Sequence, residues 1–405
     1  MSQPQRWHTV ATLGTAQTLA WASTYYLPAM LAAPMARELG VSMPTVFMAF
    51  SVALIVSALI GPFAGRAIDK WGGRPVLLVS NLVFAVGLAA LAMADTAVGL
   101  FAAWVIIGIA MGGGLYEAAF SALVRLYGND ARNAITGITL IAGFASTVSW
   151  PLSTLMEAHM GWRGACFGWA AMHLLVGFPL NWSIARVAST ASTETAASKP
   201  VAGAPAPHTT SQPSANPRLA AVLLSFVFAA TWFTSTAMAT HLPQLLQASG
   251  ATLAVAVGVG ALVGPAQVAG RLLEFGFLRR VHPLVSARLA ALTHPVGAAV
   301  LLILGAPVAA LFALLHGTGN GILTIAKGTL PLVLFGPLGY GARQGVLMMP
   351  GRICQAFAPA LFGLCLERWG AGALWVTTTL GFAAFGALLL MPKPTGEVNP
   401  HTHKP

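Results

Sequence analysis

Long apolar runs, divided by short charged segments, constrain this chain more than any other feature of its sequence. A helix needs about 20 apolar residues to cross the hydrocarbon of a bilayer, and each run is close to that length. A helix also satisfies its own backbone hydrogen bonds, which lipid cannot do for it. The sequence therefore predicts an all-α membrane protein with twelve transmembrane helices. The runs lie roughly at residues 10–33, 45–66, 75–94, 97–124, 134–156, 164–185, 219–242, 251–270, 284–304, 307–334, 344–365 and 372–391.

The composition excludes a soluble protein. Hydrophobic residues make up 57% of the 405 positions and charged residues only 8%, against about 45–50% and about 25% in soluble domains. The net charge of +11 is spread over short loops, without the basic stripe that binds nucleic acid, so we expect no nucleic-acid partner. The three cysteines lie in or beside apolar runs, which argues against a disulfide framework.

Motifs for catalysis or metal binding are missing from the sequence. We therefore expect no catalytic residue, no metal and no cofactor, and the chain is not predicted to be an enzyme. A membrane enzyme or a sensor on the same fold is the alternative from a different class. Either would need an added soluble domain or a catalytic cluster, and the sequence offers neither.

A segment rich in Ala, Ser, Thr and Pro separates the sixth run from the seventh. Such a composition buries too little apolar surface to order itself. It divides the chain into an N-terminal six-helix bundle, a flexible cytoplasmic linker, a C-terminal six-helix bundle and a cytoplasmic tail. The predicted limits are 1–185, 186–217, 218–391 and 392–405.

The loop charges predict the orientation in the membrane. Sixteen Lys and Arg residues lie in segments on the same side as the N-terminus, and only Arg37, Arg163 and Arg368 lie on the other side. Loops rich in Lys and Arg stay in the cytoplasm. We therefore expect a multi-pass protein of the cytoplasmic (inner) membrane with both termini in the cytoplasm.

The two halves share short sequence echoes. "LIGPFAGRAID" at 59–69 resembles "LVGPAQVAGRLLE" at 262–274, and "LYGNDAR" at 126–132 resembles "LFGPLGYGAR" at 334–343. The second and eighth helices therefore correspond, as do the fourth and tenth. Halves related in this way, with a binding site between them, are typical of secondary transporters.

The segment "GRAIDKWGGRP", at 65–75, resembles the signature between helices 2 and 3 of the major facilitator superfamily, and "GWRGACF", at 161–167, resembles a stretch before helix 6 of that family. The resemblance implies two six-helix bundles related by pseudo-two-fold symmetry. It also implies that the signature residues hold a cytoplasmic gate, which the internal repeat extends to the second half. The alternative is a loop whose charges only fix topology. The implied gate residues are Gly65, Asp69, Lys70, Arg74, Arg271 and Glu274.

Two departures separate the chain from the drug–proton antiporters of that family. Those proteins usually carry an Arg near the position of Trp104, and none is present there. Their helix 5 has a Gly-Pro motif, whereas this chain has "GFASTVSWPLS" with Trp150 before Pro151. Drug export by that route is therefore not favoured.

Three ionisable residues fall inside predicted membrane helices, where a charge costs several kcal/mol and usually has a function. They are Glu117, Lys327 and Arg352. Glu117 precedes Gly128 by eleven residues and Lys327 precedes Gly336 by nine, so at about 1.5 Å rise per residue they lie at similar depth. The resemblance places their helices around a central cavity, where the two side chains could face each other.

Other roles for these groups remain open. Lys327 could extend to the inner interface, Glu117 could be a fixed partner of Arg125, and Arg352 could serve the gate. Polar and aromatic residues on the expected cavity helices are weaker candidates, because they could bind a solute or simply pack. These are Tyr25, Tyr26, Trp232, His241 and Asn320.

The function that the sequence favours is symport. We expect a monomeric secondary transporter that takes up a small organic anion or zwitterion, with protons coupled through Glu117 as a hypothesis. The excess of positive over negative charge inside the membrane favours an anion. The alternative is an exporter of a metabolite, a siderophore-like compound or a drug. The expected partners are the substrate, protons and the lipid bilayer.

Overall fold

The computed structural model describes residues 3–185 and 216–391, and within these ranges every regular element is a helix. The predicted tail and nearly all of the predicted linker lie outside the described residues. The helices of the first half are α1 (Gln3–Ala22), α2 (Leu27–Leu39), α3 (Met43–Trp71), α4 (Gly73–Ala92), α5 (Ala97–Gly114), α6 (Tyr116–Tyr127), α7 (Ala131–Ala142), α8 (Ala145–Met172) and α9 (Phe178–Trp182). Those of the second half are α10 (Pro217–Ala248), α11 (Leu253–Ala261), α12 (Val263–Gly276), α13 (Pro283–Leu304), α14 (Ala309–Phe335), α15 (Tyr340–Trp369) and α16 (Leu374–Leu389).

Each predicted apolar run corresponds to helix, but several runs are broken. The first run is α1 and α2, the fourth is α5 and α6 with a break at Leu115, and the eighth is α11 and α12 with a break at Leu262. Helix α8 passes through Gly161, whose φ of 69° and ψ of 174° are not helical. Helix α8 therefore contains the end of the fifth run and the start of the sixth.

Length and hydropathy support membrane crossing. Among the described residues, eight continuous helical stretches are long and apolar enough to span a bilayer. Two of them, Ala97–Trp182 and Tyr340–Leu389, are long enough for more than one crossing. The run formed by α1 and α2 is not in that set. The prediction of an all-α, multi-pass membrane fold is confirmed.

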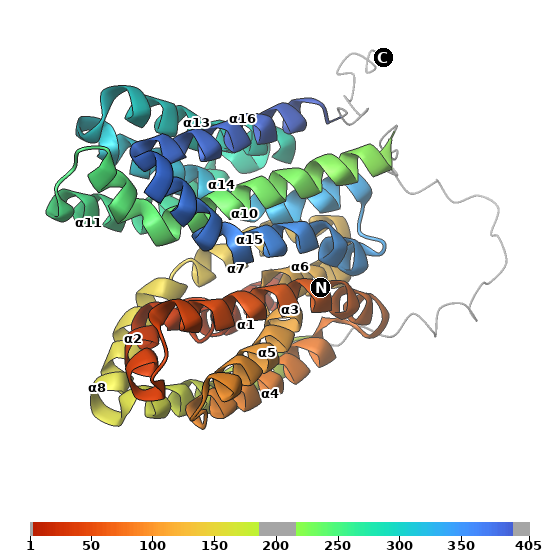
Figure 1. Ribbon diagram of the computed structural model, residues 1–405. Coiled ribbons are helices and arrows are strands. Elements are labelled where there is room, and N and C mark those ends of the chain that lie inside the picture. The colour runs from red at the N-terminus through yellow and green to blue at the C-terminus, as the bar shows by residue number, and fades with distance from the viewer. Residues whose placement is uncertain (1–2, 186–215, 392–405) are drawn as a thin grey trace, which may run out of the picture.

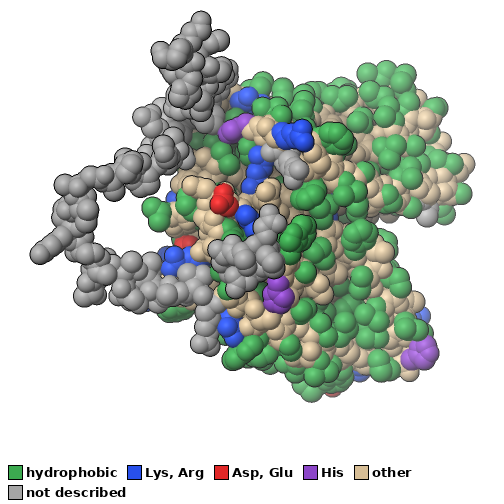
Figure 2. All heavy atoms as spheres, turned by 180° about the vertical axis from the view of Figure 1, so that it is seen from behind, with side chains coloured by type: hydrophobic (Ala, Val, Ile, Leu, Met, Phe, Trp, Pro, Cys, Tyr) green, Lys and Arg blue, Asp and Glu red, His purple; other side chains and the backbone are tan. Residues whose placement is uncertain are grey.

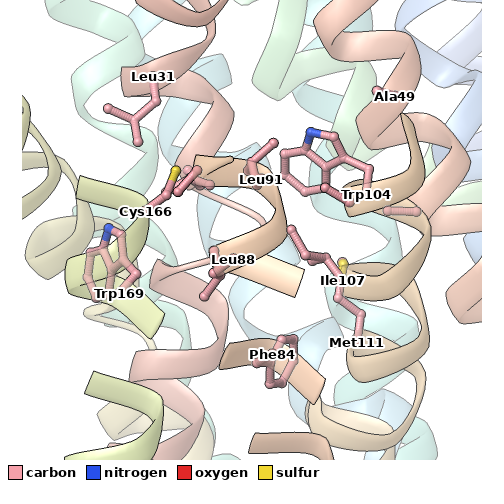
Figure 3. Close-up of a cluster of buried hydrophobic side chains, with 14 of the residues drawn as sticks. Leu31, Ala49, Phe84, Leu88, Leu91, Trp104, Ile107, Met111, Cys166 and Trp169 are labelled. Carbon is pink, nitrogen blue, oxygen red and sulfur yellow. The ribbon is translucent and has the colours of Figure 1, made fainter. Parts of the chain in front are cut away.

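The two halves form two bundles that lie side by side (Figure 1). The core of the first bundle contains Trp104, Trp169 and Phe84, all nearly inaccessible to solvent, in contact with aliphatic side chains from neighbouring helices (Figure 3). The sulfur-bearing Met111 and Cys166 fill the remaining space between these rings. Separate clusters of buried apolar residues hold the second bundle together.

The GWR stretch ties the outer ends of the first bundle together. Arg163 donates to Glu38 at 2.7 Å and to Asp95 at 2.9 Å, and Trp162 donates to Glu38 at 2.6 Å. The hydrogen bonds from Arg163 and then Trp162 lower the pKa of the Glu38 carboxyl. This network lies wholly within the first half, so it stabilises one bundle and does not join the two.

The bundles meet at one end and separate at the other. The end at which α10 begins and α16 ends is closed (Figure 1), and the space-filling view shows an indentation between the lobes at the opposite end (Figure 2). At the closed end α3 and α15 cross at glycines. A Cβ added to Gly65 would lie 2.0 Å from the carbonyl oxygen of Gly341, and one added to Gly345 would lie 2.6 Å from that of Gly61. The crossing therefore requires residues without side chains.

Replacement of Gly65 by alanine should force the halves apart at this end. The added methyl overlaps backbone that cannot move aside locally, and such overpacking costs about 1–3 kcal/mol. We expect Gly65→Ala to speed hydrogen–deuterium exchange in residues 61–69 and 341–345. Gly276→Ala is the control, because a Cβ there has no heavy atom within 4 Å. Equal exchange in the two variants would contradict the role assigned to the glycine crossing.

Candidate functional site

A buried ion pair joins the two halves between the bundles. Nη2 of Arg352, on α15, donates to both carboxylate oxygens of Glu117, at 2.9 and 3.1 Å. The side chains are only 3% and 15% exposed. Glu117 lies in the first turn of α6, next to the break at Leu115, where the positive end of the helix dipole favours a carboxylate.

Trp232 on α10 holds two cations close together. The guanidinium carbon of Arg352 lies 4.5 Å from the centre of its ring system, and the ammonium nitrogen of Lys327 lies 4.6 Å from it. Such contacts fix a cation without neutralising it. Arg352 also lies 5.7 Å from the ring of Trp21. The aromatic rings therefore define where both positive charges lie.

Lys327 is buried without a carboxylate partner. It is 6% exposed, and no described Asp or Glu forms an ion pair with it within 4.0 Å. The sequence analysis allowed Glu117 to face Lys327, and the structure pairs Glu117 with Arg352 instead. In the described part of the chain Glu117 likewise forms no ion pair with Arg125. Two cations and one carboxylate therefore share the centre.

A polar chain extends from this cluster to α1. Gln355 accepts a hydrogen bond from Nη1 of Arg352 at 3.3 Å and donates to the hydroxyl of Tyr25 at 3.1 Å. That hydroxyl lies 3.4 Å from Oγ1 of Thr236 on α10. Tyr26 lies beside Tyr25, with ring centroids 5.4 Å apart. Sequence reasoning did not single out Gln355 or Thr236, although their polarity on apolar helices was the available signal.

Two predicted cavity residues lie elsewhere. Nε2 of His241 is 2.8 Å from the carbonyl oxygen of Pro359, and Nδ1 is 3.2 Å from Gln244. Asn320 lines a separate pocket inside the second bundle, together with His294 and His316. Neither side chain contacts the central cluster in the described structure, so the contacts support no shared site.

The side chains of three predicted gate residues form hydrogen bonds with the opposite half. The carboxylate of Asp69 accepts hydrogen bonds from the backbone N–H groups of Gly341 and Ala342, at 2.9 and 2.8 Å. Glu274 accepts one from Arg132 at 3.1 Å. Nη1 of Arg271 donates to the carbonyl oxygen of Thr139 at 3.1 Å.

The other gate candidates behave differently. Gly65 forms the backbone crossing with α15. Lys70 and Arg74 lie 5.3 and 4.5 Å from the rings of Trp71 and Trp182, which belong to their own half. Arg132, which pairs with Glu274, was not predicted. Its place in the repeat, equivalent to Arg343, was the signal that could have identified it.

Comparison with solved structures supports the fold. The human organic anion transporter MFSD10 superposes with a TM-score of 0.66 at 19% identity, over 96% of this chain and 100% of that one. The transporter FucP, in an outward conformation, superposes with a TM-score of 0.70 at 15% sequence identity, over 95% of this chain and 98% of FucP. The proton:xylose symporter XylE superposes with a TM-score of 0.71 at 12% sequence identity, over 97% of each chain. At such low identity these likenesses show the fold alone.

Sequence comparison gives the family. An uncharacterized 38 kDa protein in the 23S RNA operon of Thermoproteus tenax is 31% identical over 161 residues, which cover 39% of this chain and 42% of that protein. The match therefore spans less than half of that relative. A sequence model of the Major Facilitator Superfamily matches residues 13–337, which is most of the chain. This chain, with its two membrane bundles and the charge cluster between them, belongs to the Major Facilitator Superfamily.

Proposed function

We propose that this protein is a secondary transporter that takes up a small organic anion or zwitterion across the cytoplasmic membrane by alternating access. The observation that carries the proposal is the pair of buried cations, Lys327 and Arg352, beside a single carboxylate, Glu117. A net positive charge in a hydrocarbon environment is costly, and a bound anion offsets that cost. The fold neighbour MFSD10 is named an organic anion transporter, which agrees with this charge balance.

The direction of opening follows from the loop charges. The loops rich in Lys and Arg next to Asp69 and Glu274 belong to the closed end, and such loops are cytoplasmic in membrane proteins. We therefore assign the closed end to the cytoplasm and the open end to the outside. In this state an external solute can approach the central cations, which fits uptake.

The cytoplasmic gate is proposed to consist of Gly65, Asp69, Arg271 and Glu274, with Lys70 and Arg74 stabilising its first-half side. Charge-assisted hydrogen bonds of the kind made by Asp69 and Glu274 are strong enough to hold one state and can be broken in another. Opening to the cytoplasm has to break the contacts of Asp69 with α15. The Gly65→Ala variant, which prevents this closure, should therefore also slow transport.

Glu117 is the proposed proton acceptor of the central site. A cavity of about 10 Å³ adjoins it, which is room for about one water molecule. When the anionic group of the substrate takes the place of Glu117 at Arg352, the carboxylate is left buried and unpaired. A buried carboxylate without a partner favours its protonated form, so anion and proton bind together.

The experiment that tests the proposed function compares metabolites between a deletion strain and an overexpressing strain. We expect an organic anion or zwitterion to remain in the medium of the deletion strain and to be depleted by the overexpressing strain. Mass spectrometry of cells and medium measures this and identifies the compound. A compound trapped inside the deletion strain would instead establish the exporter alternative.

Removal of the Lys327 charge should weaken anion binding. Lys327→Met keeps much of the side-chain volume, and we expect the KM for the anion in vesicle exchange to rise at least about tenfold, equivalent to about 1.4 kcal/mol. Arg368→Ala, which removes an exposed charge at the other end of α15, is the matched control and should leave KM unchanged. An unaltered KM in Lys327→Met would refute the anion site.

Replacement of Glu117 by glutamine should remove the pH dependence of exchange. The amide imitates the protonated carboxyl, so Arg352 is available to substrate at every pH. We expect KM in the variant to be nearly constant between about pH 5 and pH 8, the range in which proton-coupled groups act. Glu367→Gln, at an exposed position on α15, is the control. A pH profile like that of the wild type in Glu117→Gln would exclude coupling through Glu117.

A further inference from the structure

The second bundle contains a polar pocket that is separate from the central site. It lies between α10, α13, α14 and α16, and its apolar walls consist of alanine, glycine and Leu323. The volume open to water is about 30 Å³, enough for about two water molecules. Its polar lining consists of Thr231, Thr234, Thr293, His294, His316 and Asn320.

Two histidines in this pocket share one hydrogen bond. Nδ1 of His294, on α13, lies 2.9 Å from Nδ1 of His316, on α14. The rings cross at 70°, and the side chains are 8% and 3% exposed. Phe312 stacks on His316, with ring centroids 6.0 Å apart. The apolar contacts hold the rings in register, so the bond between them persists.

The geometry fixes how many hydrogens the pair carries. A bond between two Nδ1 atoms needs one donor and one acceptor, so one ring is protonated at Nδ1 and the other at Nε2. The ring that donates from Nδ1 then has a bare Nε2. A proton can bind there without breaking the bond between the rings. Nε2 of His294 is buried and has no hydrogen-bond partner among the described protein atoms, so this position is available.

Charged neighbours do not occupy the pocket. Helices α10 and α16 contribute only threonine, alanine and glycine to its lining. The charged side chains on the packed helices are Arg288 on α13, Lys327 on α14, and Arg271 and Glu274 on α12; none of them lines it. Arg288 donates instead to the carbonyl oxygen of Leu388 at the end of α16. The histidine pair is therefore the only titratable group of the described residues that faces this space.

The pocket lies behind the central site. Thr231 in the pocket precedes Trp232 in α10, and Asn320 lies about two turns before Lys327 in α14. We propose that the pocket is a proton-binding site, in which His294 and His316 together take up a single shared proton. A positive charge held there adds to the potential at Trp232 and attracts an anion to the central site. This consequence rests on the proposed function, whereas the proton site itself does not.

Proton titration of the purified protein tests the site without any substrate. Protons bound between about pH 8 and pH 4, the range that includes histidine, are counted for the wild type and for His294→Asn and His316→Asn. In His294→Asn the amide takes the place of Nδ1 and can keep the hydrogen bond, but the free Nε2 is removed with the ring. In His316→Asn the amide oxygen can accept from Nδ1 of His294, and the Nε2 of that ring remains. His294→Asn should bind about one proton fewer than the wild type, His316→Asn should keep that proton at Nε2 of His294, and the double variant should bind about one fewer, because the pair takes up a single proton.

The control is His159→Asn, at an exposed position two residues before the kink of α8 at Gly161, where Nδ1 lies 2.8 Å from the carbonyl oxygen of Leu155. Its effect should be additive with that of the double variant, because His159 does not line the pocket. Circular dichroism at both ends of the titration verifies that the helices persist. Losses of two protons in the double variant would show independent groups and overturn the shared site. No loss in His294→Asn would show a pair that stays neutral, and would also overturn the shared site.

Discussion

The ion pair between Glu117 and Arg352 is the interaction on which the centre of this molecule depends. It joins α6 to α15, and so one half to the other, at a depth where lipid offers no polar partner. Removal of one member of a buried pair leaves an uncompensated charge and costs about 3–5 kcal/mol. The closed state therefore needs either this pair or another anion at Arg352. In the proposed function, that dependence is what would allow a bound anion to take part in the conformational change.

The centre also requires hydrogen-bond partners for the backbone groups that are exposed where helices are broken. The break between α5 and α6 leaves the carbonyl oxygen of Gly114 free, and Gln17 donates to it at 2.7 Å. The break after α1 leaves the carbonyl oxygen of Ala22 without a helical partner, and the hydroxyl of Ser149 donates to it at 2.7 Å. Side chains of neighbouring helices thus replace the missing backbone partners. The breaks place Tyr25 and Glu117 beside the central cluster, which continuous helices would not do.

The sequence was sufficient for the fold but not for the pairing at the site. Apolar runs of membrane length predict helices whatever their partners, so the all-α membrane bundles could be derived from hydropathy. Glu117, Lys327 and Arg352 could be selected because charges are rare in such runs. Their partners depend on helix rotation and on side-chain reach, which periodicity does not encode. Gln355 connects Arg352 to Tyr25, yet a single glutamine in an apolar helix carries no pattern of its own.

The repeat also shows where equivalence in sequence stops being equivalence in structure. Arg66 and Arg271 occupy the same place in the two echoes, but Arg66 is exposed beside Phe63 and Arg271 is buried against Thr139 of the other half. Asp69 binds backbone N–H groups, and its counterpart Glu274 binds an arginine side chain. The Asp69 contact therefore depends on fixed backbone groups and tolerates little displacement. The Glu274 contact depends on a long, flexible arginine side chain and tolerates more. If the closed end is the proposed cytoplasmic gate, the α7–α12 contact, which is held by side chains, is accordingly the one expected to loosen first.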